Sequence, residues 1–145
     1  MSHGGQGYLP PAKVSSSYKA LALAAVVAVF ALVVLGGVVR ATDSGLGCPD
    51  WPLCYGSVIP PLNGPTLLEY SHRLAASMVS VLVLTVAVLT WWSYLTESRR
   101  AGLLLPATIG VLLLLGEIVL GGITVLMELP PLTVAAHFAI AQALL

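Results

Sequence analysis

The sequence is short of charge. Six basic and six acidic residues among 145 make it 8% charged, whereas a soluble domain carries about 25%. So few charges cannot cover a water-facing surface, which excludes a soluble enzyme, and they leave no basic surface with which to bind nucleic acid. Disorder is excluded as well, because 58% of the residues are hydrophobic. The composition therefore predicts a membrane protein.

Long uncharged runs between these charges predict an all-α integral membrane protein, a four-transmembrane-helix bundle with an ordered outer loop between the first two helices. The helices are predicted at about 20–39, 69–95, 102–127 and 132–145. They form a membrane domain, residues 20–145, which follows a cytoplasmic tail, residues 1–19. A span needs about 20 apolar residues, so the fourth helix is expected to be half a span or to continue beyond Leu145.

Basic residues near the helix ends set the expected orientation. Four of them flank one side of the bundle and two flank the other: Lys13, Lys19, Arg99 and Arg100 against Arg40 and Arg73. Cytoplasmic segments carry the excess of Lys and Arg. We therefore expect a multi-pass cell-membrane protein with a cytoplasmic N-terminus, and with the loop at residues 40–68 on the outer face.

The outer loop contains the only two cysteines of the chain, Cys48 and Cys54. Thiols oxidise on the outer side of a membrane, so we predict a disulfide that staples this loop. A thiol relay is the alternative. Against it, Cys-x5-Cys lacks the Cys-x-x-Cys spacing of thiol oxidoreductases, and the chain has no second pair to pass electrons onward.

Two histidines are expected at the same depth in the membrane. His72 lies a few residues inside the outer end of the second predicted helix, and His137 lies similarly inside the fourth. Level histidines in a helix bundle can ligate one heme iron from opposite faces. Small residues nearby, Ala75 and Ala76 after His72 and Ala136 and Ala141 on either side of His137, would leave room for a flat macrocycle. The alternative is that each histidine only hydrogen-bonds a neighbouring helix.

Charged residues surround this predicted heme site. Glu69 shares a helical face with His72 and Arg73; it could orient the histidine, move protons or stabilise a cationic intermediate, or simply pair with Arg73. Arg40 and Arg73 are candidates to bind the heme propionates. Glu117, near mid-membrane, is expected to serve a proton path or a bound ligand, or else to be protonated and bonded to a neighbouring Ser or Thr.

A weak internal repeat relates the two halves of the chain. Leu35-Gly36-Gly37 ends the first predicted helix, and Leu120-Gly121-Gly122 lies near the outer end of the third. Each is followed by a Pro-containing outer segment and then by a histidine-bearing helix. Two similar hairpins would thus each supply one histidine, and the glycine pairs would let helices approach closely.

Several sequence runs carry a family resemblance. They are Gly36-Gly37-Val38-Val39-Arg40-Ala41-Thr42, Ser44-Gly45-Leu46-Gly47-Cys48-Pro49-Asp50-Trp51-Pro52-Leu53-Cys54, Glu69-Tyr70-Ser71-His72-Arg73, and Leu120-Gly121-Gly122-Ile123-Thr124-Val125 before Leu129-Pro130-Pro131. Together they resemble the signature of the heme A synthases, over residues 35–145. One departure is Asp43, where the family pattern usually has Gly; it is expected to change the loop turn without touching a proposed ligand.

The resemblance implies a function that composition alone does not. Heme A synthases oxidise a methyl group of heme O to the formyl group of heme A, for use in terminal oxidases. By this resemblance, His72 and His137 are axial ligands of the heme iron, Glu69 is the catalytic carboxylate, and Cys48 and Cys54 form the outer-loop disulfide. Heme is the implied cofactor, with heme O as substrate, heme A as product and a b-type heme as a further candidate.

Typical family members have eight helices in two similar halves, one for the substrate heme and one for a b-type heme. This chain resembles one half, and Glu69-x-x-His72 with the cysteine pair indicates the N-terminal, substrate-type half. The expected partners are heme O, heme O synthase, a terminal oxidase and further copies of this chain.

Two other functions stay open. A bis-histidine membrane cytochrome for electron transfer would need His72 and His137 but not Glu69. A quinone-linked thiol oxidase would depend on Cys48 and Cys54 and bind no heme.

We expect the chain to self-associate in the membrane, because subunits of a homo-oligomer could replace the second half that typical family members carry. Cross-linking and sedimentation of the detergent-solubilised protein should then show an oligomer. A monomer that is fully active would contradict this expectation.

Overall fold

The computed structural model describes residues 14–97 and 101–145. These residues form four α-helices, α1 (Ser16–Ala41), α2 (Gly64–Glu97), α3 (Ala101–Leu126) and α4 (Pro131–Leu144). An isolated bridge between Cys54 and Ser57 is the strand-like pairing found in this part of the chain. The predicted all-α architecture with four helices is confirmed. Residues 1–13 of the expected tail, Arg99 and Arg100 lie outside the described residues.

The helix ends differ from the predicted ones because local capping signals extend the helices beyond the uncharged runs. α1 begins at Ser16, and the Oγ of the preceding Ser15 accepts a hydrogen bond from the backbone N–H of Tyr18, at 3.2 Å. α2 begins at Gly64, so Pro65 falls in the first helical turn, where a missing N–H costs nothing. α2 therefore has 34 residues and carries Glu69 inside the helix rather than at its start.

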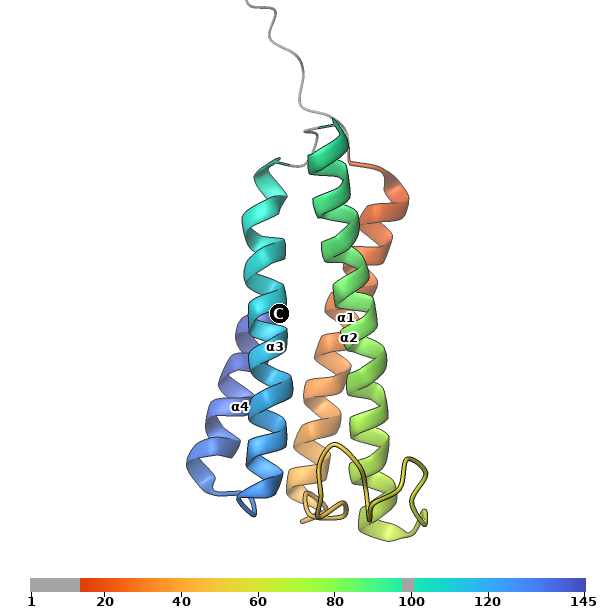
Figure 1. Ribbon diagram of the computed structural model, residues 1–145, viewed down its shortest axis with the longest axis vertical. Coiled ribbons are helices and arrows are strands. Elements are labelled where there is room, and N and C mark those ends of the chain that lie inside the picture. The colour runs from red at the N-terminus through yellow and green to blue at the C-terminus, as the bar shows by residue number, and fades with distance from the viewer. Residues whose placement is uncertain (1–13, 98–100) are drawn as a thin grey trace, which may run out of the picture.

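The four helices form two hairpins that lie side by side (Figure 1). α1 packs against α2 and α3 against α4, while α2 contacts α3 and α1 contacts α4 to close the ring. The start of α1 lies at the same end of the bundle as the α2–α3 junction, and the long loop lies at the opposite end with the α3–α4 turn (Figure 1). This matches the expected alternation of the spans. Which end faces the cytoplasm stays a prediction.

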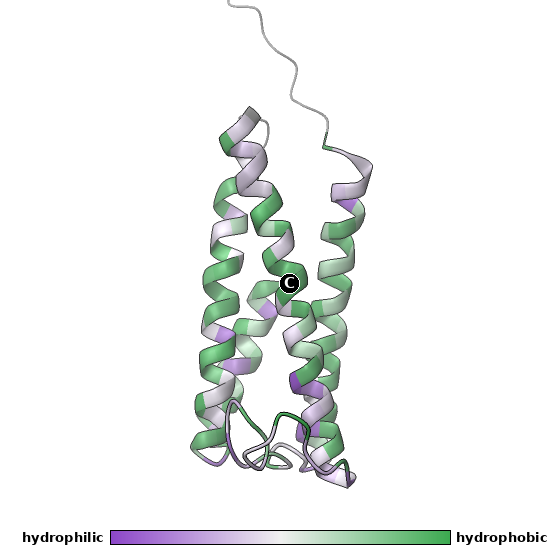
Figure 2. Ribbon diagram, turned by 45° about the vertical axis from the view of Figure 1, so that its right-hand side comes forward, coloured by the Kyte–Doolittle hydropathy of each residue, from purple (hydrophilic) through white to green (hydrophobic). Residues whose placement is uncertain are grey.

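The outside of the bundle is apolar. Large hydrophobic side chains point outward on every long helix, for example Leu23 with 64% and Met78 with 68% of their surface exposed. Three helices of the described residues are long and apolar enough to cross a membrane, and α4, with 14 residues, is shorter. Hydrophobic residues cover most of each helix, and several of the hydrophilic patches lie in the half next to the loop (Figure 2). Such a surface fits lipid rather than water, so the chain is a membrane protein.

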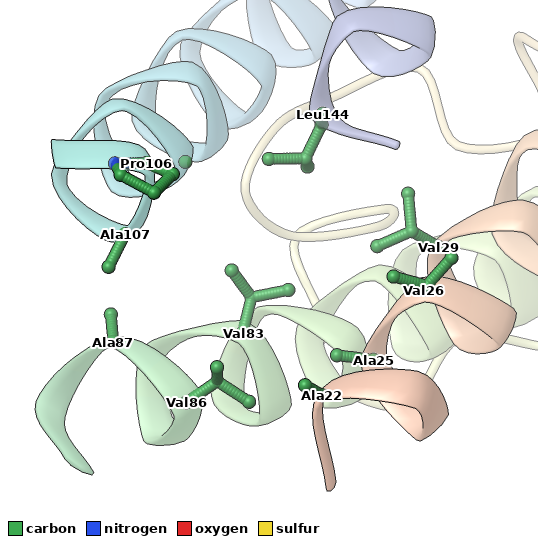
Figure 3. A pocket seen from close by; sticks show the side chains of 11 residues that line it. Ala22, Ala25, Val26, Val29, Val83, Val86, Ala87, Pro106, Ala107 and Leu144 are labelled. Atoms are coloured by element: carbon green, nitrogen blue, oxygen red, sulfur yellow. The ribbon is translucent and has the colours of Figure 1, made fainter. Parts of the chain in front are cut away.

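The end of the bundle away from the loop holds a small apolar cavity of about 200 Å³ (Figure 3). Side chains of α1, α2 and α3 line it, with Leu144 of α4 at its edge. Polar bonds hold the helices together near this end. The Tyr18 hydroxyl lies 2.7 Å from Oγ1 of Thr90, and Nε1 of Trp91 donates to Oγ1 of Thr108 at 3.2 Å. These contacts join α1 to α2 and α2 to α3.

The loop between α1 and α2 is held together by internal contacts. Cys48 and Cys54 form a disulfide and are both buried, which supports the predicted staple. The carboxylate of Asp50 accepts hydrogen bonds from the backbone N–H groups of Tyr55, at 2.6 Å, and Gly56, at 2.7 Å. These bonds, the one from Gly56 foremost, hold the pKa of Asp50 below its ordinary value. The turn is therefore organised by an anion at neutral pH.

This loop also packs against the α3–α4 hairpin. A Cβ on Gly122 of α3 would lie 2.8 Å from the Trp51 ring, and a Cβ on Gly45 would lie 2.9 Å from Leu129 in the α3–α4 turn. Such distances are shorter than carbon atoms tolerate. Gly122 therefore needs to be glycine beside the rigid Trp51 ring, whereas a side chain at position 45 would require the flexible Leu129 to shift. The loop thus bridges the two hairpins at the end of the bundle where the histidines lie.

Replacing Gly122 by Ala should loosen this bridge. The added methyl group would collide with the rigid indole of Trp51, and overpacking of this kind costs about 1–3 kcal/mol. We expect a lower midpoint of thermal unfolding in detergent. Gly116→Ala is the matched control on the same helix, because a Cβ there meets nothing within 4 Å; it should leave the midpoint unchanged or raise it. Equal midpoints for the two variants would disprove the proposed contact.

Candidate functional site

A large cavity opens between the two hairpins, in the half of the bundle next to the loop. Its volume is about 540 Å³, within the range of about 300–1,000 Å³ that is usual for ligand sites. All four helices contribute to its wall, and Trp51 and Pro52 add side chains from the loop. The wall contains the six predicted site residues other than the cysteines: Arg40, Glu69, His72, Arg73, Glu117 and His137. The fold therefore brings together residues that lie up to 97 positions apart, Arg40 to His137.

The two histidines are held in the same way, one in each hairpin. A Cβ on Gly36 of α1 would lie 3.1 Å from Cε1 of His72 on α2. A Cβ on Gly121 of α3 would lie 3.1 Å from Cε1 of His137 on α4. Each imidazole thus rests edge-on against a glycine of the preceding helix. The internal repeat is real in the structure, and the first glycine of each pair is the one that receives the ring.

Four buried polar atoms of the described residues lack a hydrogen-bond partner. They are Nδ1 of His72, Oε1 of Glu117, Oγ1 of Thr124 and Nδ1 of His137. Each belongs to a residue in the wall of the large cavity. Buried polar groups are rarely left unpaired in native proteins, so their concentration here indicates a site for a ligand. The alternative that His72 only hydrogen-bonds a neighbouring helix through Nδ1 is not found in the described residues.

Glu69 and Arg73 form an ion pair, which was one of the alternatives predicted from their spacing on the helix. Nε of Arg73 donates to Oε1 of Glu69 at 2.8 Å, with 16% and 6% of the two side chains exposed. The same guanidinium donates to three loop carbonyls, those of Cys48, Asp50 and Leu53, at 2.7–2.8 Å. Arg73 therefore fastens the loop to α2. Glu69 still faces the cavity wall, with Oε2 not used by Arg73.

The two arginines differ in what they can offer an anion. Arg73 already uses four of its five N–H donors. Arg40 has only a loose pair with Asp43, whose Oδ1 lies 3.6 Å from Nη1, and half of its side chain is exposed. Arg40 is the better placed of the two to bind a carboxylate of a ligand. Propionate binding by either residue stays a prediction.

The departure at Asp43 has a backbone explanation. Asp43 has a φ of 51°, in the left-handed region. Glycine adopts this conformation most easily, and Asp is among the residues that tolerate it. The Gly of the family pattern fits this conformation. Asp43 pairs with Arg40, one of the two propionate candidates. That Asp43 touches no proposed iron ligand stays a prediction.

Glu117 lies beside the second histidine. Its Oε2 is 3.0 Å from Nδ1 of His137, and only 11% of the side chain is exposed. The other oxygen, Oε1, has no hydrogen-bond partner, so the predicted alternative of a bond from that atom to a neighbouring Ser or Thr is not what the described residues show. The atoms of Glu117 and His137 are close enough for an ion pair without being aligned as a hydrogen bond.

Several wall residues were not proposed as site residues from the sequence, among them Trp51, Pro52 and Thr124. All three stand inside the runs that carried the resemblance. Their membership in those runs was the available signal. Their side-chain chemistry carried none, because an aromatic ring, a proline and a hydroxyl are common in loops and membrane helices.

Known proteins with similar sequences point to one family. Residues 19–66 match a family described as "Cytochrome oxidase assembly protein". The heme A synthase of Bacillus pumilus is 36% identical over 125 residues, which cover 83% of this chain and 40% of that protein. The heme A synthase of Lysinibacillus sphaericus is 36% identical over 126 residues, covering 84% and 39%. That of Bacillus licheniformis is 33% identical over 127 residues, covering 87% and 41%.

The chain spans about two fifths of the length of these curated relatives. The aligned part contains most of this chain. Most of this chain is therefore similar in sequence to part of the proteins named heme A synthase.

Proposed function

We propose that this chain takes part in heme A synthesis by oxidising a methyl group of heme O to a formyl group. The observation that carries the proposal is the matched pair His72 and His137, one from each hairpin, on a single cavity lined by unpaired buried polar atoms. The similarity to proteins named heme A synthase supports a role in heme A synthesis.

The residues of the cavity fit a heme. In each histidine Nδ1 is the buried, unpaired nitrogen, which leaves Nε2 as the atom available to iron. The small side chains of Ala76 and Ala141 line the space between the hairpins, where a flat macrocycle would lie. Arg40, half exposed at the loop end, could bind a propionate through its planar fork. A bound heme iron would supply the redox chemistry of the site.

Conversion of the methyl group removes protons that the protein must accept. Written with water as the oxygen source, a methyl group and one water give a formyl group, four protons and four electrons, and the electrons leave to an acceptor of the respiratory chain or to dioxygen. Glu69 is placed to accept protons, because it lies in the cavity wall one helical turn before His72. Arg73 holds Oε1 of this carboxylate, so Oε2 is the oxygen we assign to proton transfer.

Several parts of the proposal concern the assembly around this chain. We propose that copies of the chain associate, that heme O synthase supplies the substrate and that a terminal oxidase receives the product. We also place the disulfide loop on the outer face of the cell membrane, following the distribution of basic residues. For the position of the loop, the support from the described residues is that the loop and both histidines lie in the same half of the bundle.

Glu69→Gln should separate this enzyme from a cytochrome that only transfers electrons. The amide keeps the size of the side chain but cannot accept a proton, so we expect heme A formation to fall about 10²- to 10⁴-fold, the usual contribution of a general base. Heme content and absorption spectrum should stay the same. The measurement is chromatography of hemes extracted after incubation with heme O. Unchanged turnover would favour the bis-histidine cytochrome instead.

Gly36→Ala should weaken heme binding by displacing His72. The new methyl group would lie 3.1 Å from Cε1 of the ring, so the imidazole must move by a few tenths of an ångström. We expect the dissociation constant for iron protoporphyrin to rise by about tenfold, equivalent to about 1.4 kcal/mol, in an absorption titration. Gly37→Ala is the adjacent control, since a Cβ there meets nothing within 4 Å. Identical affinities for the two variants would show that Gly36 does not seat the ring.

A further inference from the structure

The carboxylate of Glu117 has no role in the proposed reaction, although it lies deep in the bundle. Oε2 is 3.0 Å from Nδ1 of His137, the side chain is 11% exposed, and Oε1 is buried without a partner. An ionisable group in the membrane interior is costly and is found where it serves a function. The contact with His137 is the interaction that would offset the free-energy cost of burying this carboxylate.

The second carboxylate in the cavity wall is engaged differently. Glu69 is bound through Oε1 to the guanidinium of Arg73, which offsets its charge and ties it to the loop. No basic side chain of the described residues lies within ion-pair distance of Glu117 other than the imidazole of His137. The two carboxylates are therefore not equivalent.

The internal repeat shows that this contact exists in one hairpin only. Gly121 receives the ring of His137, and Glu117 stands four residues before it on α3. Gly36 receives the ring of His72, and the residue four positions before it on α1 is Leu32, which also lines the cavity. Nδ1 of each histidine lacks a hydrogen-bond partner, but among the described residues only that of His137 has a carboxylate oxygen within ion-pair distance. Two histidines seated in the same way thus differ by one carboxylate.

We propose that Glu117 is a positioning residue for His137. Its carboxylate accepts a hydrogen bond from Nδ1–H of His137 and so holds the imidazole in the tautomer that leaves Nε2 free for the cavity. The same bond makes His137 the more electron-donating of the two histidines. At 3.0 Å the two atoms are within hydrogen-bond distance, so alignment requires only a change of orientation, and the last torsion of glutamate is soft. Carboxylate partners of metal-ligating histidines act in this way. The part that concerns iron rests on the proposed heme binding.

The tautomer can be tested without heme. Nitrogen-15 NMR of the histidine-labelled chain in detergent distinguishes the two ring nitrogens. The signals are assigned by substituting His3, His72 and His137 with Gln one at a time, since each variant loses the signals of one ring. We expect His137 of the wild type to be protonated at Nδ1, and Glu117→Leu to turn it into a mixture of tautomers. Leu32→Ala is the matched control from the other hairpin and should leave His137 unchanged. An unaltered His137 in Glu117→Leu would overturn the proposal.

The electronic effect is tested with iron protoporphyrin as the probe. Glu117→Leu should raise its dissociation constant about 10- to 100-fold, as is typical when such a partner is lost. It should also raise the midpoint potential, by about 59 mV for each tenfold loss in the preference for ferric over ferrous heme. Glu117→Gln, whose amide oxygen can still accept a hydrogen bond from Nδ1–H, should restore most of the affinity and less of the potential shift. If Glu117→Leu does not fold, Glu117→Gln alone decides: a wild-type potential would count against the proposal.

These readouts separate the inference from the proposed function. If the wild-type chain binds no heme, the proposed function fails, while the NMR result still decides whether Glu117 sets the tautomer of His137. If the chain binds heme and the Glu117 variants match the Leu32→Ala control in potential and tautomer, only the positioning role fails.

Discussion

The site depends on the hydrogen bonds that the guanidinium of Arg73 donates. A cation near the end of a membrane helix must find acceptors, because water and lipid offer too little compensation there. Arg73 finds one carboxylate, that of Glu69, and three carbonyls of the loop. These bonds fasten the disulfide loop over the cavity and hold one oxygen of Glu69 in place. The wall residues Trp51 and Pro52 reach the cavity because the loop is fastened in this way.

A second constraint acts between the helices. Two hairpins can enclose a ligand only if the side chains that face it have room, and Gly36 and Gly121 provide that room for one imidazole each. The arrangement is nearly symmetric in geometry and asymmetric in charge, because Glu117 stands beside His137 and Leu32 takes its place in the other hairpin. A symmetric scaffold therefore carries two histidines with different surroundings. A ligand bound between the two histidines would therefore meet a different electrostatic environment on each of its faces.

The fold was largely predictable because lipid imposes a simple rule. Every backbone group inside a membrane must be paired, so uncharged runs of sufficient length become helices. Charges such as Lys19 and Arg40 therefore separated the spans well. The exact ends were less predictable, since α1 starts at a Ser15 cap and α2 starts at Gly64-Pro65 in a stretch that reads as loop by composition. Local hydrogen bonds decide such ends, and a hydropathy pattern does not contain them.

The candidate site divides in the same way. The sequence by itself determined which residue types carry chemistry: two histidines at matched depth, carboxylates at Glu69 and Glu117, and a cysteine pair in one loop. Their spacing along single helices predicted that Glu69 and Arg73 share a face, because that relation is local. Only the tertiary structure decided that Arg73 binds the loop and that Glu117 lies against His137. The physical reason is that such contacts join different elements, and their partners follow from how the hairpins pack rather than from the order of residues in the chain.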